Sequence, residues 1–321
     1  MHGDKGALEY SFVIPIYNDA YLANDFCEEF SRVFREYLGT DTIESRAEVI
    51  FVNDGSADDS YVRLRDEICA RYKFAKVIDL SRNFGQHIAI SCGYKYARGR
   101  YVAASNVDME DPPGQFPLLL DVVRTGEYDF VGGRYRSRGV SWLNRTTSLL
   151  FSRLLNTLTG YEVPLDMAML RVMDRSFIDA YNQLVERSRY LPGLESWLGF
   201  RKTWVLIEHR PRTRGRSSFN LRRRFAFAIG AILSFSDLPL RITVVAGGLI
   251  TLIGTVMSLA LIASRIFLGD VQLGFTTTVS AIVFMGGAQM IVIGVASLYV
   301  GHILREVQGR PLFVVRDTHG F

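Results

Sequence analysis

The segment YSFVIPIYND (residues 10–19) decides the fold, because an apolar run of strand-forming residues ends there in a polar loop. The pattern recurs along the first 134 residues, with a helix-like segment after each run. Near-continuous apolar strands that alternate with helices are typical of an α/β fold with a mostly parallel, buried sheet. The predicted strands are residues 10–16, 48–52, 76–80, 101–104 and 128–131, and the predicted helices are residues 19–38, 58–72, 86–97 and 113–125.

Polar loops follow these strands, and a parallel sheet binds its ligands beyond the carboxyl ends of its strands. The loops contain residues 17–19, 53–56, 81–85 and 106–113. The chain has no GxGxxG, GxxxxGK or HExxH motif. Its net charge is only +4, from 37 basic and 33 acidic residues. The sequence therefore gives no support to dinucleotide redox chemistry, a P-loop nucleotidase, a zinc peptidase or a nucleic-acid partner.

Three oxygen-bearing side chains, Asn106, Asp108 and Glu110, follow the fourth strand at a spacing of two. In extended backbone, alternate side chains face the same side, so we expect the three groups to converge. Mg²⁺ and Mn²⁺ prefer oxygen ligands, and such sites often use few protein ligands with substrate phosphates completing them. The alternative is a polar turn before the next helix, with Asp111 ahead of two prolines.

Arginines are concentrated in two later segments. Guanidinium groups bind phosphate through paired hydrogen bonds, so these segments suit a lipid phosphate or a nucleoside diphosphate. The alternative is a solvated basic face attracted to anionic lipid. The first segment has Arg134, Arg136, Arg138 and Arg145, and the second has Arg210, Arg212, Arg214 and Arg216 at a spacing of two.

Two long apolar segments lie near the C-terminus. Residues 242–264 and 271–301 contain no charged side chain over 23 and 31 residues. As a helix, the first would be about 34 Å long, which is enough to cross the hydrocarbon core of a bilayer. Their short separation predicts a two-helix transmembrane hairpin, and a pair of buried core helices is the alternative.

Basic residues bracket this hairpin on both sides, whereas its turn holds only Arg265 against Asp270. The positive-inside rule then places both termini and the long N-terminal part in the cytoplasm, at an inner or plasma membrane. Residues 222–233 begin with three arginines and continue as an apolar run. This pattern predicts an interfacial helix, with an ordinary core helix as the alternative. Glycines in the apolar segments would permit a homo-oligomer.

Six short motifs in order, followed by the hairpin, resemble glycosyltransferase family 2. The similarity is to its polyprenyl-phosphate glycosyltransferase branch, which includes dolichyl-phosphate mannose synthases and bacterial undecaprenyl-phosphate glycosyltransferases. The resemblance implies a GT-A fold, a nucleotide-sugar donor, Mg²⁺ or Mn²⁺ as cofactor, and a polyprenyl-phosphate acceptor at the lipid bilayer. The motifs are residues 15–18, 53–56, 80–85, 108–113, 133–134 and 212–219.

The resemblance also implies roles for individual residues. The family's metal motif, Asp-x-Asp followed two residues later by Gln, falls on Asn106, Asp108 and Glu110, with Asn106 and Glu110 as departures. The residues that would bind the donor nucleotide are Pro15, Tyr17, Asp19, Asp54 and Arg82. Catalytic roles would fall to Asp108, Arg134 and Asp166, and the acceptor phosphate to Arg134, Arg145, Ser148, Arg212 and Ser217.

The implied reaction is inverting transfer to a lipid phosphate, which is already an anion at neutral pH and needs no general base to attack. Two other interpretations stay open: a glycosyltransferase that acts on a hydroxyl acceptor, and a catalytically degenerate membrane protein that binds lipid or nucleotide. The expected organisation is a GT-A catalytic domain at residues 1–215, a basic interfacial region at 216–240, a transmembrane hairpin at 241–303 and a cytoplasmic tail at 304–321.

Overall fold

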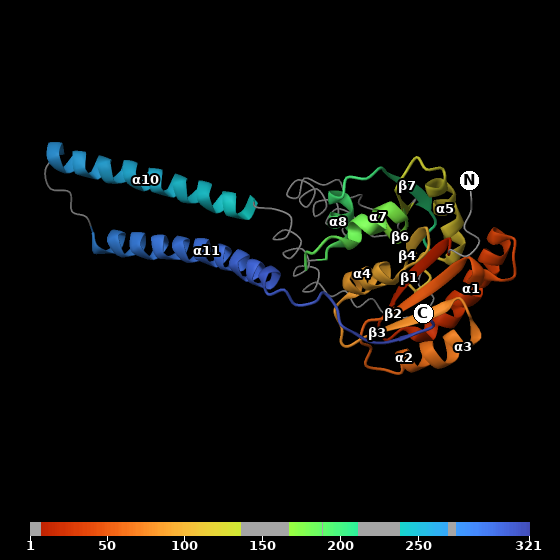
Figure 1. Cartoon of the computed structure of the whole chain (residues 1–321). Coiled ribbons are helices and arrows are strands. Elements are labelled where there is room, and N and C mark those ends of the chain that lie inside the picture. The colour runs from red at the N-terminus through yellow and green to blue at the C-terminus, as the bar shows by residue number, and fades with distance from the viewer. Residues whose placement is uncertain (1–7, 136–166, 188, 211–237, 269–273) are drawn as a thin grey trace. The chain divides into compact units, whose positions relative to one another are not determined.

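The computed structural model of the chain describes residues 8–135, 167–187, 189–210, 238–268 and 274–321. The chain divides into two compact units. One unit comprises residues 1–221 together with 310–321, and the other comprises residues 222–309. The first unit contains a β-sheet and the second contains two long helices (Figure 1).

An eight-stranded mixed sheet forms the centre of the first unit, in the order β7-β5-β6-β4-β1-β2-β3-β8. The pairs β4–β1, β1–β2, β2–β3 and β5–β7 are parallel, whereas β6 and β8 run antiparallel to their neighbours. The predicted α/β class with a mostly parallel sheet is confirmed. The strands are β1 (Tyr10–Ile16), β2 (Ala47–Asn53), β3 (Ala75–Leu80), β4 (Tyr101–Ala104), β5 (Phe130–Tyr135), β6 (Met167–Asp174), β7 (Lys202–Ile207) and β8 (Val315–His319).

Helices cover both faces of the sheet (Figure 1). Successive side chains of a strand point to opposite faces. On β1, Phe12 packs against α1, while Val13 meets Gly93 of α4 on the other face. The helices of this unit are α1 (Ala23–Leu38), α2 (Ser60–Arg63), α3 (Cys69–Arg71), α4 (Gln86–Tyr96), α5 (Phe116–Arg124), α7 (Arg175–Asn182) and α8 (Leu191–Trp197), with short helical turns at Ala20–Leu22, Ile43–Ser45, Leu64–Ile68 and Pro113–Gln115.

An aromatic cluster fixes β1 against two of these helices. The ring of Phe12 lies 4.9 Å from that of Phe30 and 4.8 Å from those of Phe34 and Phe116, measured between centroids. All four side chains are fully buried. Buried aromatic pairs at such distances stabilise a core through burial of apolar area and through edge-to-face contacts. The loop after β1 therefore starts from a rigid position.

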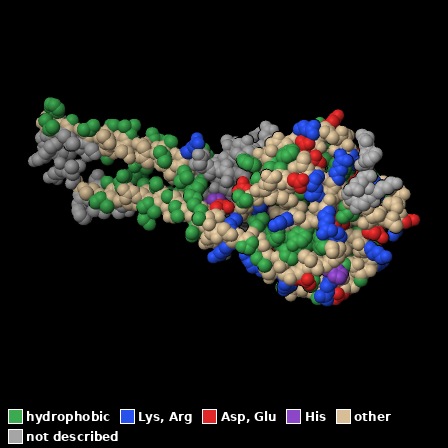
Figure 2. Space-filling model, viewed as in Figure 1, with side chains coloured by type: hydrophobic (Ala, Val, Ile, Leu, Met, Phe, Trp, Pro, Cys, Tyr) green, Lys and Arg blue, Asp and Glu red, His purple; other side chains and the backbone are tan. Residues whose placement is uncertain are grey.

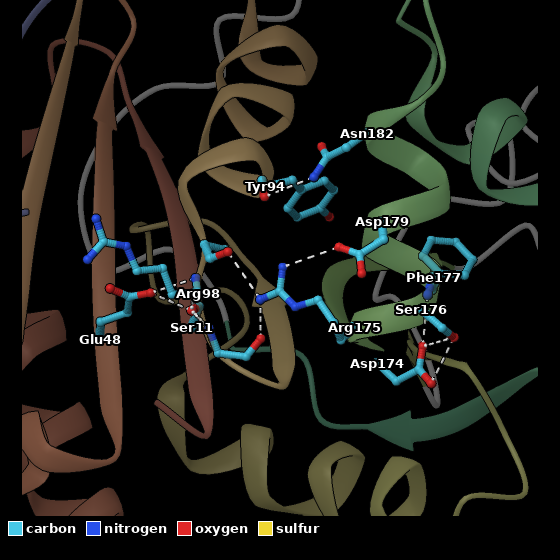
Figure 3. A network of polar contacts seen from close by, with 12 residues as sticks. Ser11, Glu48, Tyr94, Arg98, Asp174, Arg175, Ser176, Phe177, Asp179 and Asn182 are labelled. Carbon is cyan, nitrogen blue, oxygen red and sulfur yellow. Dashed lines mark hydrogen bonds and ion pairs between the residues drawn. The ribbon is translucent and has the colours of Figure 1, made fainter. Parts of the chain in front are cut away.

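A polar network lies at the amino-terminal ends of β1 and β2 (Figure 3). Ser11 Oγ donates to Glu48 Oε1 at 2.6 Å, and the amide of Arg98 donates to the same oxygen at 3.0 Å. From α7, the guanidinium of Arg175 donates to the carbonyl of Ala97 at 3.1 Å. These contacts fix the turn between α4 and β4. This turn lies at the amino ends of the parallel strands, whereas the polar loops predicted to bind ligands follow their carboxyl ends.

Two long helices, α10 (Leu238–Leu268) and α11 (Phe275–Val307), are the described elements of the second unit. Each is long and apolar enough to cross a membrane, with windows at Leu240–Met257 and Phe284–Val307 whose mean hydropathies are 1.9 and 1.6. Neither window is buried, and Figure 2 shows hydrophobic side chains along the outside of both helices. The described residues thus give no support to the alternative of two buried core helices. The predicted interfacial helix at 222–233 lies outside the described residues.

The structure differs from the prediction after β4. Extended backbone from Asn106 to Glu110 is a wrong expectation, because residues 107–111 form a tight turn. Met109 has a φ of +62°, which is rare for a bulky residue. The three candidate metal ligands therefore do not alternate along a strand.

The structure of the C-terminal residues also differs from the prediction. Residues 310–321, expected as a tail, belong to the first unit, and their strand β8 pairs with β3.

Candidate active site

The loops that follow β1, β2, β3 and β4 meet at the carboxyl edge of the sheet, because these four strands are parallel. The loops after β1 and β2 are joined by Asn18. Its amide donates to Ser56 Oγ, and its Oδ1 accepts from the amide of Ala57, both at 2.9 Å. Asn18 has a φ of +58°, a conformation that asparagine tolerates better than most residues.

The loops after β2 and β3 are joined by Asp54. Its buried carboxylate accepts from the amides of Phe84 at 2.7 Å and Gly85 at 2.9 Å. Burial raises the pKa of Asp54, and these two hydrogen bonds oppose the rise. Next to it, Gly55 has a φ of +61°, and a Cβ there would lie 2.2 Å from the carbonyl carbon of Arg82. A glycine is therefore required for the close approach of the two loops.

The loop after β4 is joined to the amino end of α4 and to the other half of the sheet. Gln86 Nε2 donates to Asn106 Oδ1 at 2.6 Å. At the far end of the loop, Asp111 accepts from Tyr135 Oη at 2.7 Å and from the amide of Leu170 at 3.2 Å. The loop that carries Asp108 is thus anchored at both ends.

Negative charge is concentrated around this anchored loop. Asp108 is buried, and its Oδ1 accepts from the amide of Glu110 at 3.2 Å. The pKa of Asp19 is raised to about 6, mainly by burial, with smaller contributions from the charges of Asp108 and Asp58. Burial also raises the pKa of Asp111, with added effects from Asp108 and Glu110. Buried carboxylates whose pKa values are raised further by nearby negative charge are a common feature of functional sites.

The donor set at this edge fits a hard divalent cation only in part. Asp108 and Glu110 supply carboxylates, and the Oδ1 of Asn106 keeps a second lone pair beside its bond to Gln86. Among the described residues, no group of three His, Cys, Asp or Glu side chains could hold a metal ion. Two carboxylates and one amide suit Mg²⁺ or Mn²⁺ that is also bound by substrate phosphates.

The predicted donor residues lie at this same edge. Pro15 is buried within β1, whereas the Tyr17 side chain is 49% exposed. The amide of Tyr17 donates to Asp19 Oδ1 at 2.8 Å, which fixes the Asp19 carboxylate against the backbone of Tyr17. The exposed guanidinium of Arg82 stacks on the ring of Phe84 at 4.2 Å. The structure therefore places Tyr17, Asp19, Asp54 and Arg82 at the carboxyl ends of the parallel strands.

Part of the predicted acceptor site can also be placed. Arg134 is exposed near the carboxyl end of β5, at the same edge of the sheet. The amide of Arg210 donates to the carbonyl of Glu110 at 3.1 Å, so the second arginine segment starts beside the Asp108 loop. The predicted residues Arg145, Ser148, Asp166, Arg212 and Ser217 lie outside the described residues.

Several residues that hold the loops of the site in place were not recognised from the sequence. Ser56 and Asp111 lie inside the quoted motifs, and only the fold reveals what they bind. Gln86 directly follows the Ser-Arg-Asn-Phe-Gly loop, where its position at the start of a predicted helix was the available signal. Tyr135, at the end of β5, had none, because its partner Asp111 is 24 residues away.

This arrangement can be compared with known proteins. Residues 11–181 match the sequence profile of glycosyl transferase family 2. The chain belongs to glycosyl transferase family 2. The expected family and the expected activity, that of a glycosyltransferase, are confirmed.

Curated family 2 relatives match over nearly the whole chain. An uncharacterized glycosyltransferase of Synechocystis sp. is 36% identical, over 98% of this chain and 96% of that protein. The undecaprenyl-phosphate 4-deoxy-4-formamido-L-arabinose transferase of Proteus mirabilis is 30% identical, over 97% and 94%. The crystal structure of glucosyl-3-phosphoglycerate synthase from Mycobacterium tuberculosis with Mn²⁺, UDP and glucosyl-3-phosphoglycerate aligns with a TM-score of 0.46 and 21% identity, covering 72% of this chain and 81% of that one.

Proposed function

We propose that this family 2 enzyme transfers a sugar from a nucleotide sugar to a polyprenyl phosphate, at a membrane and with the help of a divalent cation. The observation that carries the proposal is the anchored loop of Asp108 beside the donor loops, which concentrates carboxylates where a diphosphate would need a cation. Relatives named as undecaprenyl-phosphate transferases, aligned over nearly their full length, support the acceptor class.

In this proposal, the loops after β1, β2 and β3 bind the nucleotide. Tyr17 offers an exposed ring on which a base can stack, and the Asp19 carboxylate accepts a hydrogen bond from the Tyr17 amide. Asp54 acts mainly by holding the Phe84–Gly85 backbone in place, since both of its oxygens are engaged there. Arg82 presents its guanidinium to a phosphate or ribose.

Asp108, Glu110 and Asn106 would hold Mg²⁺ or Mn²⁺ together with the donor diphosphate. The cation would neutralise the charge that grows on the departing nucleoside diphosphate. Burial is the main cause of the raised pKa values of Asp19 and Asp111, and neighbouring carboxylates add to both shifts; a bound cation would compensate that added negative charge.

The acceptor needs little activation. A phosphate monoester is an anion at neutral pH, with a second pKa of about 6. One of its oxygens attacks the anomeric carbon as the bond from that carbon to the diphosphate oxygen breaks, and the electron pair leaves with the diphosphate. A single displacement of this kind inverts the anomeric configuration. The role of the protein is to align the two phosphates and to screen their repulsion.

Arginines would perform that alignment. Arg134 lies near the carboxyl end of β5, at the same end of the sheet as the Asp108 loop, and Arg210 starts a segment beside that loop. We assign the acceptor phosphate to Arg134, Arg145, Ser148, Arg212 and Ser217, and a supporting catalytic role to Asp166. The last five of these residues stand on the family resemblance alone.

We also propose that α10 and α11 cross the membrane and keep the enzyme where its lipid acceptor lies. Their apolar windows are long enough and are not buried. The positive-inside rule favours a cytoplasmic location for both termini. A homo-oligomer formed through these helices stays a prediction.

The acceptor assignment can be tested with a matched pair of lipids. Purified full-length enzyme in detergent is given Mn²⁺, a panel of radiolabelled nucleotide sugars, and either undecaprenyl phosphate or undecaprenol. We expect label in the lipid phase with the phosphate and none with the alcohol. Transfer to the alcohol would favour a hydroxyl-acceptor enzyme instead. Absence of both transfer and nucleotide binding would favour a degenerate scaffold.

A further inference from the structure

The strand β8 follows the second apolar helix in sequence and returns to the edge of the catalytic sheet. It runs antiparallel to β3, with Val315 opposite Leu80 and His319 opposite Val77. The amide of Ser81, the first residue of the loop after β3, donates to the carbonyl of Val314 at 2.9 Å. The C-terminal segment therefore touches a donor loop directly.

Strand β8 also forms an ion pair with a buried carboxylate. Arg316 Nε lies 2.6 Å from Asp79 Oδ2, and a second guanidinium nitrogen lies 2.5 Å from the same oxygen. The Asp79 side chain is completely buried, whereas that of Arg316 is 58% exposed. A buried carboxylate needs a charged partner or several donors to offset its lost hydration. Arg316 supplies that charge from the edge of the sheet.

Asp79 connects Arg316 to the start of the loop after β2 through a second hydrogen bond. Its second oxygen, Oδ1, accepts from Asn53 Nδ2 at 2.7 Å. Asn53 Oδ1 in turn accepts from Ser56 Oγ at 2.5 Å. Both ends of the Asn53 amide are therefore engaged, so its orientation is fixed. An aspartate at this position could not donate to Asp79 and would place a second carboxylate beside it.

Ser56 completes the path to the loop after β1. Its Oγ accepts from the amide of Asn18, and Asn18 Oδ1 accepts from the amide of Ala57. Asn18 lies in left-handed backbone, between Tyr17 and Asp19, and such conformations persist only where neighbouring contacts hold them. Loss of Ser56 from its place would release Asn18, and with it the two donor residues on either side.

We propose that Arg316 is a positioning residue for the nucleotide half of the donor site. It acts through Asp79, Asn53 and Ser56 to hold the Asn18 turn. The polar path is continuous from β8 to the turn. This inference rests on the proposed function, since it takes Tyr17 and Asp19 as nucleotide ligands. It makes the segment after the membrane helices a working part of the donor site.

The test compares Arg316→Gln with Tyr61→Phe in the full-length enzyme. Tyr61 Oη donates to Asp317 Oδ2 at 2.5 Å, so the control removes the neighbouring contact of β8 without touching Asp79. For Arg316→Gln we expect the donor KM and the UDP dissociation constant to rise about tenfold, while the acceptor KM changes less than about twofold. Arg316→Lys, which keeps the charge, should recover part of the loss. Equal donor constants in Arg316→Gln and Tyr61→Phe would overturn the proposal.

A second readout needs no substrate. The amides of Asn18 and Ala57 are donors in the path, so their hydrogen exchange reports on it directly. Exchange should be faster in Arg316→Gln and unchanged in Tyr61→Phe. Unchanged exchange in both would refute the path even if nucleotide binding is intact. Faster exchange in an enzyme that binds no nucleotide would instead uphold the path and refute the proposed function.

Ser56→Ala covers the case in which Arg316→Gln fails to fold. It breaks the path in the middle and leaves β8 paired with β3. It should reproduce the rise in donor KM, and Arg316→Lys added to it should cause little further change, because the two residues act in series. A normal donor KM for Ser56→Ala, or full additivity of the two changes, would contradict the proposal.

Discussion

The carboxylate of Asp111 accepts a 2.7 Å hydrogen bond from the hydroxyl of Tyr135, which ties the end of the Asp108 loop to the end of β5. Both side chains are buried. The same carboxylate accepts from the amide of Leu170 on β6. The position of Asp108 therefore depends on contacts between strands that are distant in sequence.

The first prediction concerns this bond. Tyr135→Phe leaves a buried acceptor with one donor fewer, so we expect the free energy of unfolding to fall by about 1–3 kcal/mol. Tyr37→Phe is the matched control, because Tyr37 Oη also donates to an aspartate, at 2.8 Å, but at an exposed site. Its expected cost is below about 0.5 kcal/mol. Thermal unfolding of the detergent-solubilised chain gives the comparison, and equal losses would contradict the assigned role of Tyr135.

The second prediction concerns the close approach of the loops after β2 and β3, which we propose bind the donor nucleotide. Gly55 and Gly39 share a φ of +61°, but only at Gly55 does an added Cβ meet other atoms. Alanine at either position carries the cost of left-handed backbone, about 1–2 kcal/mol. We expect Gly55→Ala to lose more stability than Gly39→Ala, and to weaken UDP binding as well, because the Arg82 backbone must move. Calorimetric titration with UDP measures this. Equal affinities in the two variants would refute the requirement for close approach.

The third prediction is a pH dependence. Asp19 has a folded pKa of about 6, above its ordinary value of 3.8. The folded state therefore holds this proton more tightly, and its contribution to stability is present below about pH 4 and lost as the pH rises through 6. Asparagine cannot ionise and keeps the acceptor for the Tyr17 amide. Without divalent ions, the difference in unfolding free energy between Asp19→Asn and the wild type should grow by about 2 kcal/mol in favour of the variant from pH 4 to pH 7. A difference that stays the same at both pH values would contradict the raised pKa.

The fourth prediction concerns the buried ion pair between β6 and α8. Arg171 Nη1 lies 2.6 Å and 2.7 Å from the two carboxylate oxygens of Glu195, and both side chains are almost completely buried. Arg171→Met alone should cost about 3–5 kcal/mol, because it leaves an unpaired buried carboxylate. The double variant Arg171→Met with Glu195→Leu should recover most of that loss. Unfolding measurements on both variants decide the point, and a double variant that is no better than the single one would count against it.

The sequence predicted the parallel half of the sheet well. Residues 10–16, 76–80 and 101–104 were expected as strands, and β1, β3 and β4 match them almost residue by residue. These strands are buried on both faces, so their apolar runs are uninterrupted and easily recognised. The polar loops after them were found for the same reason, since each begins where an apolar run ends.

Two of the other strands, β5 and β8, were predicted less well or not at all, for different physical reasons. β5 was expected at residues 128–131, yet it begins at Phe130 and continues through two glycines to Tyr135. A Cβ on Gly132 would lie 2.2 Å from the Trp204 ring, so packing selects glycine within that strand. β8 consists mostly of exposed, polar residues after a long apolar helix and resembles a tail. Only its partners Asp79 and Tyr61, more than 230 residues away, explain why it is a strand.

The turn at Met109 shows that the spacing of residues in a motif does not predict the conformation of its backbone. The spacing of Asn106, Asp108 and Glu110 was recognised, but extended backbone was the wrong expectation. The three residues are positioned instead by Gln86 at one end of the loop and Tyr135 at the other. Such anchors come from other elements, and no local pattern reveals them.

The most direct measurement of the central claim is sugar transfer to undecaprenyl phosphate by wild type and Asp108→Asn, each with Mn²⁺ and with excess EDTA. Asparagine preserves the shape of the side chain and removes its charge, so the fold should survive, as thermal unfolding would verify. The account predicts robust transfer by wild type with Mn²⁺, and a loss of at least about a hundredfold, nearly 3 kcal/mol, both in EDTA and in the variant. Full transfer by Asp108→Asn, or by the wild type in EDTA, would contradict it.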